Sequence, residues 1–526
     1  MNKLSQISEN KRSILRGSFG SAAATLLARI LGLFRVILEA RVLGGAALAT
    51  SWQLAFLIPN LFRRLFGEGA LSQALIPMLS HTEAEKGLNE VRRQLALVLA
   101  VLTGLLTVIT IIVSIIGFLI GNCCQVPDYV KNAMQILPLL MPYAIFICLV
   151  GVMTAVVNTR KVFFLASLNA LILNIVLIGL LWAGQYISFQ NNRSILLLLT
   201  VGVVVSGALQ LLMLGWLLKK YGVFPIFRSA ERPAKSICQE LYTLTLPGMI
   251  SGGASQLSFL VDRSIACWVG AYAVPALNYT ERLVYLPIGI VAIALGSVLM
   301  ADMSRAAANK KYDEMLDDMT LGLRYVWFFC APLAIFMIAY REPLIRLLFM
   351  GGKFTEVNVQ ATASALFFYA MGIPAFCAAK VILPAFYARK KMNTPLKISL
   401  TCIVLNIPLS ILLMFPLRQG GIALATVISQ MLNNFLLLYT LRRENFSPDY
   451  RQIACTMIRS VSWAAAGVLP IICAPQALRQ LLPNDLLLTV GGVIFFGVIY
   501  LAGSILTRAP EPREFYSSIK SRKKEC

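Results

Sequence analysis

LALVLAVLTGLLTVITIIVSIIGFLI, residues 95–120, is an uninterrupted run without a single charged side chain. About 20 such residues span the hydrocarbon core of a bilayer as a helix. Outward along the chain, comparable runs occupy residues 165–182, 196–218 and 486–506. Backbone polar groups find no water inside a bilayer, so each run is expected to form a helix that satisfies them internally. These runs predict an all-α polytopic membrane protein.

The composition of the whole chain agrees with this class. Of its 526 residues, 58% are hydrophobic and only 13% are charged, whereas a soluble domain carries about 25% charged residues. The net charge of +23 would suggest nucleic acid as the partner of a soluble protein. Here most Lys and Arg lie in short gaps between apolar runs, a pattern that sets membrane topology. Nucleic acid is therefore not expected as a partner.

Zinc, disulfide and nucleotide-hydrolysis sites are not expected either. The eleven cysteines are scattered without a CxxC pair and the chain has one histidine, His81, so neither a zinc site nor a disulfide framework is supported. A GxxxxGK[ST] phosphate loop does not occur in the sequence. The chain is therefore not expected to hydrolyse ATP, and any energy that it uses would come from an ion gradient, the membrane potential or a solute gradient.

Apolar windows predict about fourteen spans, and the gaps between them alternate in charge. Lys and Arg gather in every second gap and in the C-terminal tail, so both termini are expected in the cytoplasm. The first residues are polar and basic without a cleavage site, so the first helix is expected to be retained. The predicted spans are 20–42, 50–79, 94–121, 134–157, 161–184, 194–218, 240–268, 275–301, 320–340, 360–386, 395–415, 420–441, 455–474 and 486–507.

Three short sequence similarities suggest that the chain contains an internal repeat. ARVLG (40–44) matches ACWVG (266–270), and two further pairs follow in the same order at an offset of about six spans. The predicted domains are an N-terminal lobe (1–220), a C-terminal lobe (221–445) and two extra helices with a basic tail (446–526). Two pseudo-symmetric six-helix lobes around a central cavity form a transporter architecture that works by alternating access. Chance similarity among apolar helices remains the alternative.

Ionisable residues inside spans are costly and therefore indicate function. A group of arginines suits a phosphate or pyrophosphate, because each stays charged and its planar fork bonds two oxygens at once. Arg64 ranks below the others because it lies beside another arginine. The alternative is that the arginines reach the membrane interface or pair with carboxylates. The substrate-binding candidates are Arg29, Arg35, Arg63 and Arg282, and Glu68 and Glu281 are expected to act in pairing or gating.

A cation site is the second candidate in the spans. Asp262, Asn406 and Thr426 supply oxygen atoms from spans 7, 11 and 12, and hard cations such as Na⁺ prefer oxygen ligands. The alternative is structural: Asp262 pairs with Arg263, and Asn406 bonds a neighbouring helix, as polar residues in membranes often do.

Five stretches of the sequence resemble one known family. They are ARILGLFR (28–35), IPNLFRRLFGEGALSQALIPML (58–79), NYTERLVYLPIGIVAIALGSVLM (278–300), GGKFT (351–355) and FYARKKMNTPLKI (386–398). In these motifs the chain resembles the MurJ/MviN family of lipid II flippases, part of the multidrug/oligosaccharidyl-lipid/polysaccharide exporter group. The likeness runs over nearly the whole chain, and the span-2 run is highly specific.

The resemblance implies export of the undecaprenyl-pyrophosphate-linked peptidoglycan precursor, lipid II, from the cytoplasmic to the periplasmic leaflet of the bacterial inner membrane, and no enzyme activity. By this resemblance, the family's cavity arginines correspond to the four candidates above, and its span-2 glutamate corresponds to Glu68. The last two helices would form a groove for the prenyl tail. It also implies a sodium site, in some members, at Asp262, Asn406, Ile422 and Thr426. Membrane lipids and cell-wall synthases are the further partners that it suggests.

The sequence departs from the family pattern at two positions. Thr50 stands where many relatives carry a span-2 acid, and Ser410 stands where the sodium pattern has a second acid. Thr50 puts in doubt a mechanism that needs a carboxylate there, and Ser410 weakens Na⁺ coordination. Three other functions remain open: flipping of another polyprenyl-linked glycan, cation-coupled export, and a non-transport scaffold for cell-wall synthases.

Overall fold

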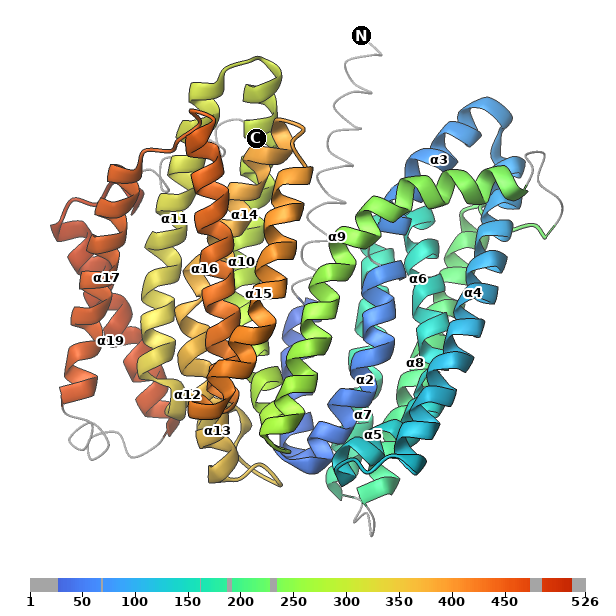
Figure 1. Ribbon diagram of the computed structural model, residues 1–526, viewed down its shortest axis with the longest axis horizontal. Helices are drawn as coiled ribbons and strands as arrows, with labels where there is room; N and C mark the ends of the chain where they lie inside the picture. The colour runs from blue at the N-terminus through green and yellow to red at the C-terminus, as the bar shows by residue number, and fades with distance from the viewer. Residues whose placement is uncertain are drawn as a thin grey trace. The chain divides into compact units, whose positions relative to one another are not determined.

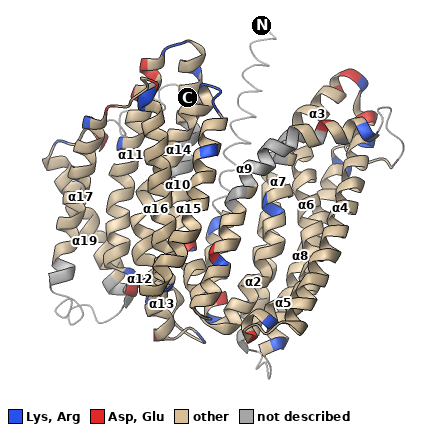
Figure 2. Ribbon diagram, in the orientation of Figure 1, with Lys and Arg blue, Asp and Glu red and all other residues tan. Residues whose placement is uncertain are grey.

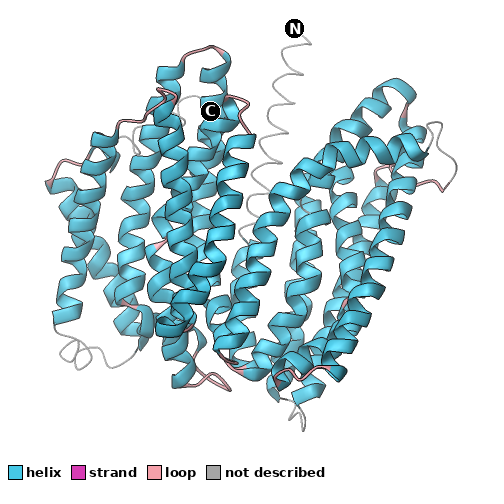
Figure 3. Ribbon diagram, in the orientation of Figure 1, coloured by secondary structure: helices cyan, strands magenta, loops and turns pink. Residues whose placement is uncertain are grey.

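The computed structural model describes residues 27–67, 70–160, 162–186, 192–227, 234–473 and 485–512. These residues form helices joined by short connections and contain no β-strand, apart from one isolated bridge between Gly351 and Phe354 (Figure 3). The predicted fold class, an all-α polytopic membrane protein, is confirmed. The chain divides into two compact units, unit 1 (Met1–Arg263) and unit 2 (Ser264–Cys526). The predicted lobe boundaries at 220 and 445 stay predictions.

Unit 1 is a helical bundle, coloured blue to green in Figure 1. Its core is apolar and includes the fully buried side chains of Trp52, Leu95 and Tyr143. α2 packs on α5, α4 on α5, and α8 on both α6 and α7. Its elements are a first helix at 27–43, α2 (Ala47–Phe62), the π-helix η1 (Arg63–Gly67), α3 (Ala70–Lys86), α4 (Leu88–Cys123), α5 (Asp128–Leu140), α6 (Pro142–Thr159), α7 (Phe163–Tyr186), α8 (Asn192–Lys220) and most of α9 (Ala234–Val269).

Unit 2 is a second bundle, in which α10 packs on α11, α13 and α14, and α15 packs on α16. Close approach of α15 and α16 depends on Gly421, because a Cβ atom there would lie 2.0 Å from the carbonyl oxygen of Leu413. The elements of unit 2 are α10 (Ala273–Ala308), α11 (Tyr312–Ala339), α12 (Arg341–Phe349), α13 (Glu356–Met371), α14 (Ile373–Ala388), α15 (Asn393–Leu417), α16 (Gln419–Arg443), α17 (Tyr450–Cys473) and α19 (Asp485–Leu506).

Within the described ranges, nine helical segments are long and apolar enough to cross a membrane, so the chain is a multi-pass membrane protein. Three predicted spans are interrupted. The second predicted span (50–79) consists of α2, η1 and α3, and the fourth (134–157) corresponds to α5 and α6. The tenth (360–386) is split into α13 and α14 at Gly372. Pro142 is the first residue of α6, and Pro374 is the second residue of α14. In the first turn of a helix the missing N–H of proline costs no helical hydrogen bond.

Charged residues within each unit lie mostly near the ends of helices, and the helix middles are largely uncharged (Figure 2). This distribution follows from the high cost of placing a charge in the hydrocarbon core. The exceptions, which lie within helices, include Arg35 and Glu281, which the sequence selects as candidates for function, and also Arg324 of α11 and Lys380 of α14.

The last two helices are fixed to α11 and α12 by close packing of glycines on aromatic rings. α17 packs on α11 and α19, and α19 packs on α12. A Cβ atom at Gly503 would lie 2.1 Å from the ring of Trp463, and one at Gly492 would lie 2.1 Å from the hydroxyl of Tyr340. The Tyr500 hydroxyl donates a 2.6 Å hydrogen bond to the Phe328 carbonyl. α17 and α19 are therefore integral to unit 2.

A buried ionic cluster lies where the chain leaves α19. Glu511 is fully buried and accepts hydrogen bonds from Arg324 Nη2 (2.9 Å), from Thr456 Oγ1 (2.8 Å) and from Arg459. Arg324 belongs to α11, and Thr456 and Arg459 belong to α17. One carboxylate therefore ties the end of the described chain to two helices.

Candidate functional site

The two candidate arginines of the first helix lie in different surroundings. Arg29 is half-buried, whereas Arg35 is 7% exposed and its Nε lies 3.2 Å from Glu39 Oε1. The Arg35 guanidinium also lies 5.9 Å from the centre of the Phe56 ring of α2. The helix is continuous through Gly32, which lies between the two arginines. Arg35 therefore carries the predicted charge inside the helix bundle together with a paired carboxylate.

The break in span 2 is a single π-helical turn, η1, that begins at Arg63. Pro59 lies in the last turn of α2, where it supplies no N–H, and Gly67 ends the π-helical turn. Just before this turn, the Phe62 carbonyl accepts a 3.3 Å hydrogen bond from the Cys148 thiol of α6. Such turns are frequent at functional sites. Proline and glycine are residue types that let a helix break, and the structure shows a break in span 2 at this point.

The adjacent arginines of η1 are both half-buried. Arg64 Nη1 donates a 3.0 Å hydrogen bond to Gln256 Oε1 of α9, and its guanidinium lies 5.4 Å from the centre of the Phe259 ring. Glu68, predicted to act in pairing or gating, lies outside the described residues.

In unit 2 the adjacent residues Glu281 and Arg282 of α10 differ in exposure. Glu281 is half-buried, and its Oε1 accepts a 2.9 Å hydrogen bond from the Tyr369 hydroxyl of α13. Arg282 is exposed. Glu281 therefore has a polar contact with a second helix, as a pairing role requires, and Arg282 presents its charge at the surface of the unit. Whether Arg282 binds substrate stays a prediction.

Two of the candidate cation ligands lie on the paired helices α15 and α16. Asn406 is 3% exposed, and its Oδ1 accepts hydrogen bonds from Ser429 Oγ (3.2 Å) and Ser410 Oγ (3.4 Å). Thr426 Oγ1 donates a 3.0 Å hydrogen bond to the Ile422 carbonyl. The structure thus shows the helix-to-helix bond that was the alternative role of Asn406.

The third candidate ligand, Asp262, is 6% exposed and lies in the part of α9 that belongs to unit 1. Its neighbour Arg263 is equally deep, at 4% exposed. In the described parts of the chain, no group of three His, Cys, Asp or Glu side chains is placed to hold a metal ion.

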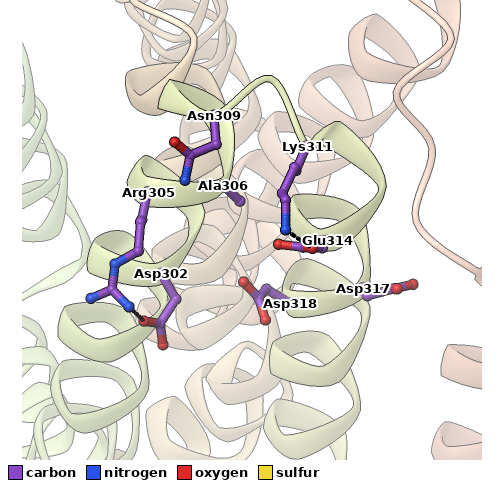
Figure 4. A pocket seen from close by; sticks show the side chains of 8 residues that line it. All are labelled: Asp302, Arg305, Ala306, Asn309, Lys311, Glu314, Asp317 and Asp318. Carbon is purple, nitrogen blue, oxygen red and sulfur yellow. Dashed lines mark hydrogen bonds and ion pairs between the residues drawn. The ribbon is translucent and has the colours of Figure 1, made fainter.

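A pocket of about 410 Å³ lies at the turn between α10 and α11, and none of the candidate residues lines it (Figure 4). Two ion pairs cross its rim, Lys311–Glu314 at 2.6 Å and Arg305–Asp302 at 4.0 Å. Their side chains are between 46% and 75% exposed, so water screens them strongly. The pocket is lined by Asp302, Arg305, Ala306, Asn309, Lys311, Glu314, Asp317 and Asp318. The pocket therefore belongs to a solvent-exposed connection between two helices.

The contact between η1 and α9 was not anticipated from the sequence. Gly253, Gln256 and Phe259 recur at intervals of three residues, which places them along one side of a helix. That spacing was the available signal, but it does not say which segment covers the face. The structure supplies the partner, since Leu65 of η1 lies 3.4 Å from a Cβ atom built on Gly253.

Comparison with known proteins identifies relatives over nearly the full length. A family model described as "Lipid II flippase MurJ" matches residues 39–491. A Rhizobium tropici protein named "Probable lipid II flippase MurJ" is 28% identical over 515 residues, which cover 94% of this chain and 95% of that protein. A Vibrio cholerae protein of the same name is 29% identical over 446 residues, covering 82% and 83%.

Solved structures show the same fold at low sequence identity. One described as "Lipid II flippase MurJ, inward closed conformation" aligns with a TM-score of 0.76 at 22% identity, covering 93% of this chain and 98% of that one. An inward-facing multidrug resistance MATE family transporter of the MOP superfamily aligns with a TM-score of 0.65 at 14% identity, covering 83% and 99%.

Proposed function

Because this chain belongs to the MurJ family of lipid II flippases, we propose that it carries lipid II from the cytoplasmic to the periplasmic leaflet of the bacterial inner membrane. Lipid II is the undecaprenyl-pyrophosphate-linked precursor of peptidoglycan, so the process served is cell-wall synthesis. The protein is a transporter and not an enzyme. Both termini lie in the cytoplasm under this proposal, as the distribution of Lys and Arg predicts.

The observation that carries the proposal is the placement of arginines within otherwise apolar helices. Arg35 is almost fully buried, and Arg29 and Arg63 are half-buried in the same unit. Permanently charged guanidinium groups at such positions need an anion, and their planar fork matches the oxygens of a pyrophosphate. A transporter of organic cations would present carboxylates instead.

The pairing of Arg35 with Glu39 suggests how the site exists without substrate. The carboxylate neutralises the buried guanidinium, which avoids the cost of an isolated charge. A pyrophosphate carries more negative charge than one carboxylate and binds several arginines together. Binding therefore changes the net charge of the site, and this change biases the alternation between inward and outward exposure. The membrane potential adds about 2.3 kcal/mol per charge per 100 mV.

Sodium coupling is a further part of the proposal. Asp262, Asn406 and Thr426 would supply oxygen ligands. The carbonyl of Ile422, one helical turn before Thr426 on α16, would supply a further one. The buried oxygen of Asn406 supports the idea, and the neutral Ser410 weakens it. In proteoliposomes, flipping by the wild type should fall when Na⁺ is replaced by choline. Equal rates in both salts would remove sodium from the mechanism.

The proposed function is tested in cells depleted of this protein. Wild type, Arg29→Ala, Arg35→Ala, Arg63→Ala and Arg282→Ala are re-expressed at matched levels, and the fraction of lipid II reached by an externally added cleaving enzyme is measured. Arg305→Ala is the matched control, since that side chain is 75% exposed on the α10–α11 connector. Wild type and the control should restore access, and the four variants should not.

Other outcomes separate the alternatives. Unchanged access to lipid II after depletion would move the assignment to another polyprenyl-linked glycan or to a scaffold for cell-wall synthases. Full restoration of access by all four arginine variants would retain the flippase and reject its arginine site. Loss of cell-wall synthesis with normal access would favour the scaffold.

A further inference from the structure

Arg64 lies in a polar contact whose parts come from two distant segments of unit 1. Its Nη1 donates to Gln256 Oε1 at 3.0 Å, and its guanidinium lies 5.4 Å from the centre of the Phe259 ring. The contact joins η1, the only π-helical turn in the described residues, to α9. Two different interactions of one side chain thus converge on one helix.

The side of α9 that receives Arg64 is also contacted by the next residue of η1. Gln256 and Phe259 are one helical turn apart, and Gly253 lies a further turn back on the same side. A Cβ atom at Gly253 would be 3.4 Å from Leu65 Cδ2, an ordinary van der Waals contact, so Leu65, the residue that follows Arg64, lies against this side of α9. The glycine, the amide and the ring therefore form one seam, defined here as Gly253, Gln256 and Phe259, that is covered by η1.

The side chain of Arg64 is already engaged on this seam, whereas Arg63 begins the same π-helical turn. Since η1 has only five residues, Arg63–Gly67, the position of its backbone relative to α9 also sets the position of Arg63. A hydrogen bond from a charged donor and a cation–π contact fix that position more firmly than apolar packing alone.

We propose that Arg64 is a positioning residue: it ties η1 to the seam on α9 and thereby holds Arg63 where Arg63 meets the anionic headgroup of the substrate. The inference rests on the proposed function and deepens it. It separates two consecutive arginines into one that binds and one that places its neighbour. Gln256 accepts the hydrogen bond without a charge of its own, so this contact does not neutralise the charge of Arg64.

A double-mutant cycle on ligand affinity tests the assignment. The probe is short-chain lipid II, titrated against the full-length protein in nanodiscs for wild type, Arg63→Gln, Arg64→Gln and the double variant. Each single change should weaken binding about tenfold, the effect expected of a lost hydrogen bond to a charged group. Since Arg64 acts through Arg63, the double variant should bind no more weakly than Arg63→Gln. Additive losses would make Arg64 a ligand in its own right and overturn the proposal.

Substitutions on α9 provide the matched set. Gln256→Leu removes the acceptor at similar volume and should weaken binding in a background that keeps Arg63, but not in Arg63→Gln. Gln256→Glu restores an acceptor and should preserve the position of η1. Leu257→Ala, at a side chain 59% exposed on the same helix, should leave affinity unchanged. If Gln256→Leu lowers only the melting temperature and not the affinity, the contact is structural and the proposal fails.

The same experiment distinguishes failure of the inference from failure of the proposed function. Normal binding by Arg63→Gln would remove Arg63 from the binding site and with it any role for Arg64 in placing it. Weak binding by Arg63→Gln with normal binding by Arg64→Gln would keep the proposed function and overturn only the inference.

Discussion

A single carboxylate near the end of the described chain, Glu511, balances two arginines from different helices. It is fully buried, and Arg324 and Arg459 approach it from α11 and α17. Breaking a buried ion pair by removing one partner is costly because the remaining charge stays buried without compensation. An uncharged side chain at position 511 would therefore leave the guanidinium groups of Arg324 and Arg459 without this compensating charge.

Glu511→Gln should therefore lower the free energy of unfolding by about 3–5 kcal/mol, the range for a broken buried pair. Thermal unfolding of both proteins in the same detergent measures the change. The control is Glu314→Gln, whose partner Lys311 is 59% exposed, and a change within about 0.5 kcal/mol is expected there. An equal effect of the two substitutions would mean that the cluster at Glu511 contributes no more than a surface pair.

The same carboxylate predicts a dependence of stability on pH. Burial alone would raise the pKa of Glu511, but hydrogen bonds from Thr456 and Arg324 and the charge of Arg459 outweigh it and leave the pKa below its usual value. A carboxyl with a lowered folded-state pKa stabilises the protein above the unfolded pKa of about 4.3, and this stabilisation is lost as the pH falls through the folded value.

The difference in melting temperature between wild type and Glu511→Gln should consequently be constant near pH 7 and shrink below about pH 4.3. Melting curves of both proteins between pH 7 and pH 3 provide the measurement. A difference that stays the same over the whole range would show that folding does not shift the pKa of Glu511.

At the scale of helices, α15 and α16 meet with almost no space at their shared turn. A Cβ atom on Gly421 would lie 2.0 Å from the Leu413 carbonyl oxygen and 2.9 Å from the Met414 nitrogen, both backbone atoms that cannot rotate away. By contrast, nothing lies within 4 Å of a Cβ atom on Gly179 of α7. The two glycines have the same chemistry and opposite surroundings.

Gly421→Ala should destabilise the protein by about 1–3 kcal/mol through overpacking. Gly179→Ala should instead be neutral or stabilising by up to about 1 kcal/mol, because alanine is the better helix former. Denaturation midpoints of both variants, measured in one detergent, give the comparison. If both substitutions were stabilising, the close approach of α15 and α16 would not exist in the protein.

The helices illustrate what the sequence could predict. The apolar run at 95–120 predicted α4, because hydropathy alone decides whether a segment lies in the bilayer. Pro59 and Gly67 are residue types that favour a break in span 2, but they do not indicate its π-helical form or the hydrogen bond that Cys148 of α6 donates beside it. The seam on α9 and the Glu281–Tyr369 bond were likewise beyond reach because they join segments far apart in sequence.

At the scale of the whole molecule, the charge pattern of the gaps predicts on which side of the membrane each connection lies. Cys123 and Cys124 end α4 in a gap assigned to the periplasm, and Cys455 lies near the start of α17, next to a gap assigned to the cytoplasm. All three side chains are exposed in the structure. They can therefore report the orientation of the chain without any added tag.

A membrane-impermeant thiol reagent should label Cys123 and Cys124 in cells whose outer membrane is made permeable, and should label Cys455 only after the inner membrane is opened. Variants that keep only the first pair or only Cys455 assign the signal, which is read by mass spectrometry. Labelling of Cys455 in cells with an intact inner membrane would reverse the predicted topology.

The hydrogen bond from Cys148 to the Phe62 carbonyl also limits how the chain can be altered. Position 148 lies in an apolar helix, where valine or leucine would look acceptable by hydropathy, yet neither side chain could donate the hydrogen bond to the Phe62 carbonyl, and leucine is also larger than cysteine. Serine meets both requirements, whereas alanine keeps the size and lacks the donor. A cysteine-free chain made for labelling should therefore carry serine at this site, and evolutionary drift there should be confined to small donors.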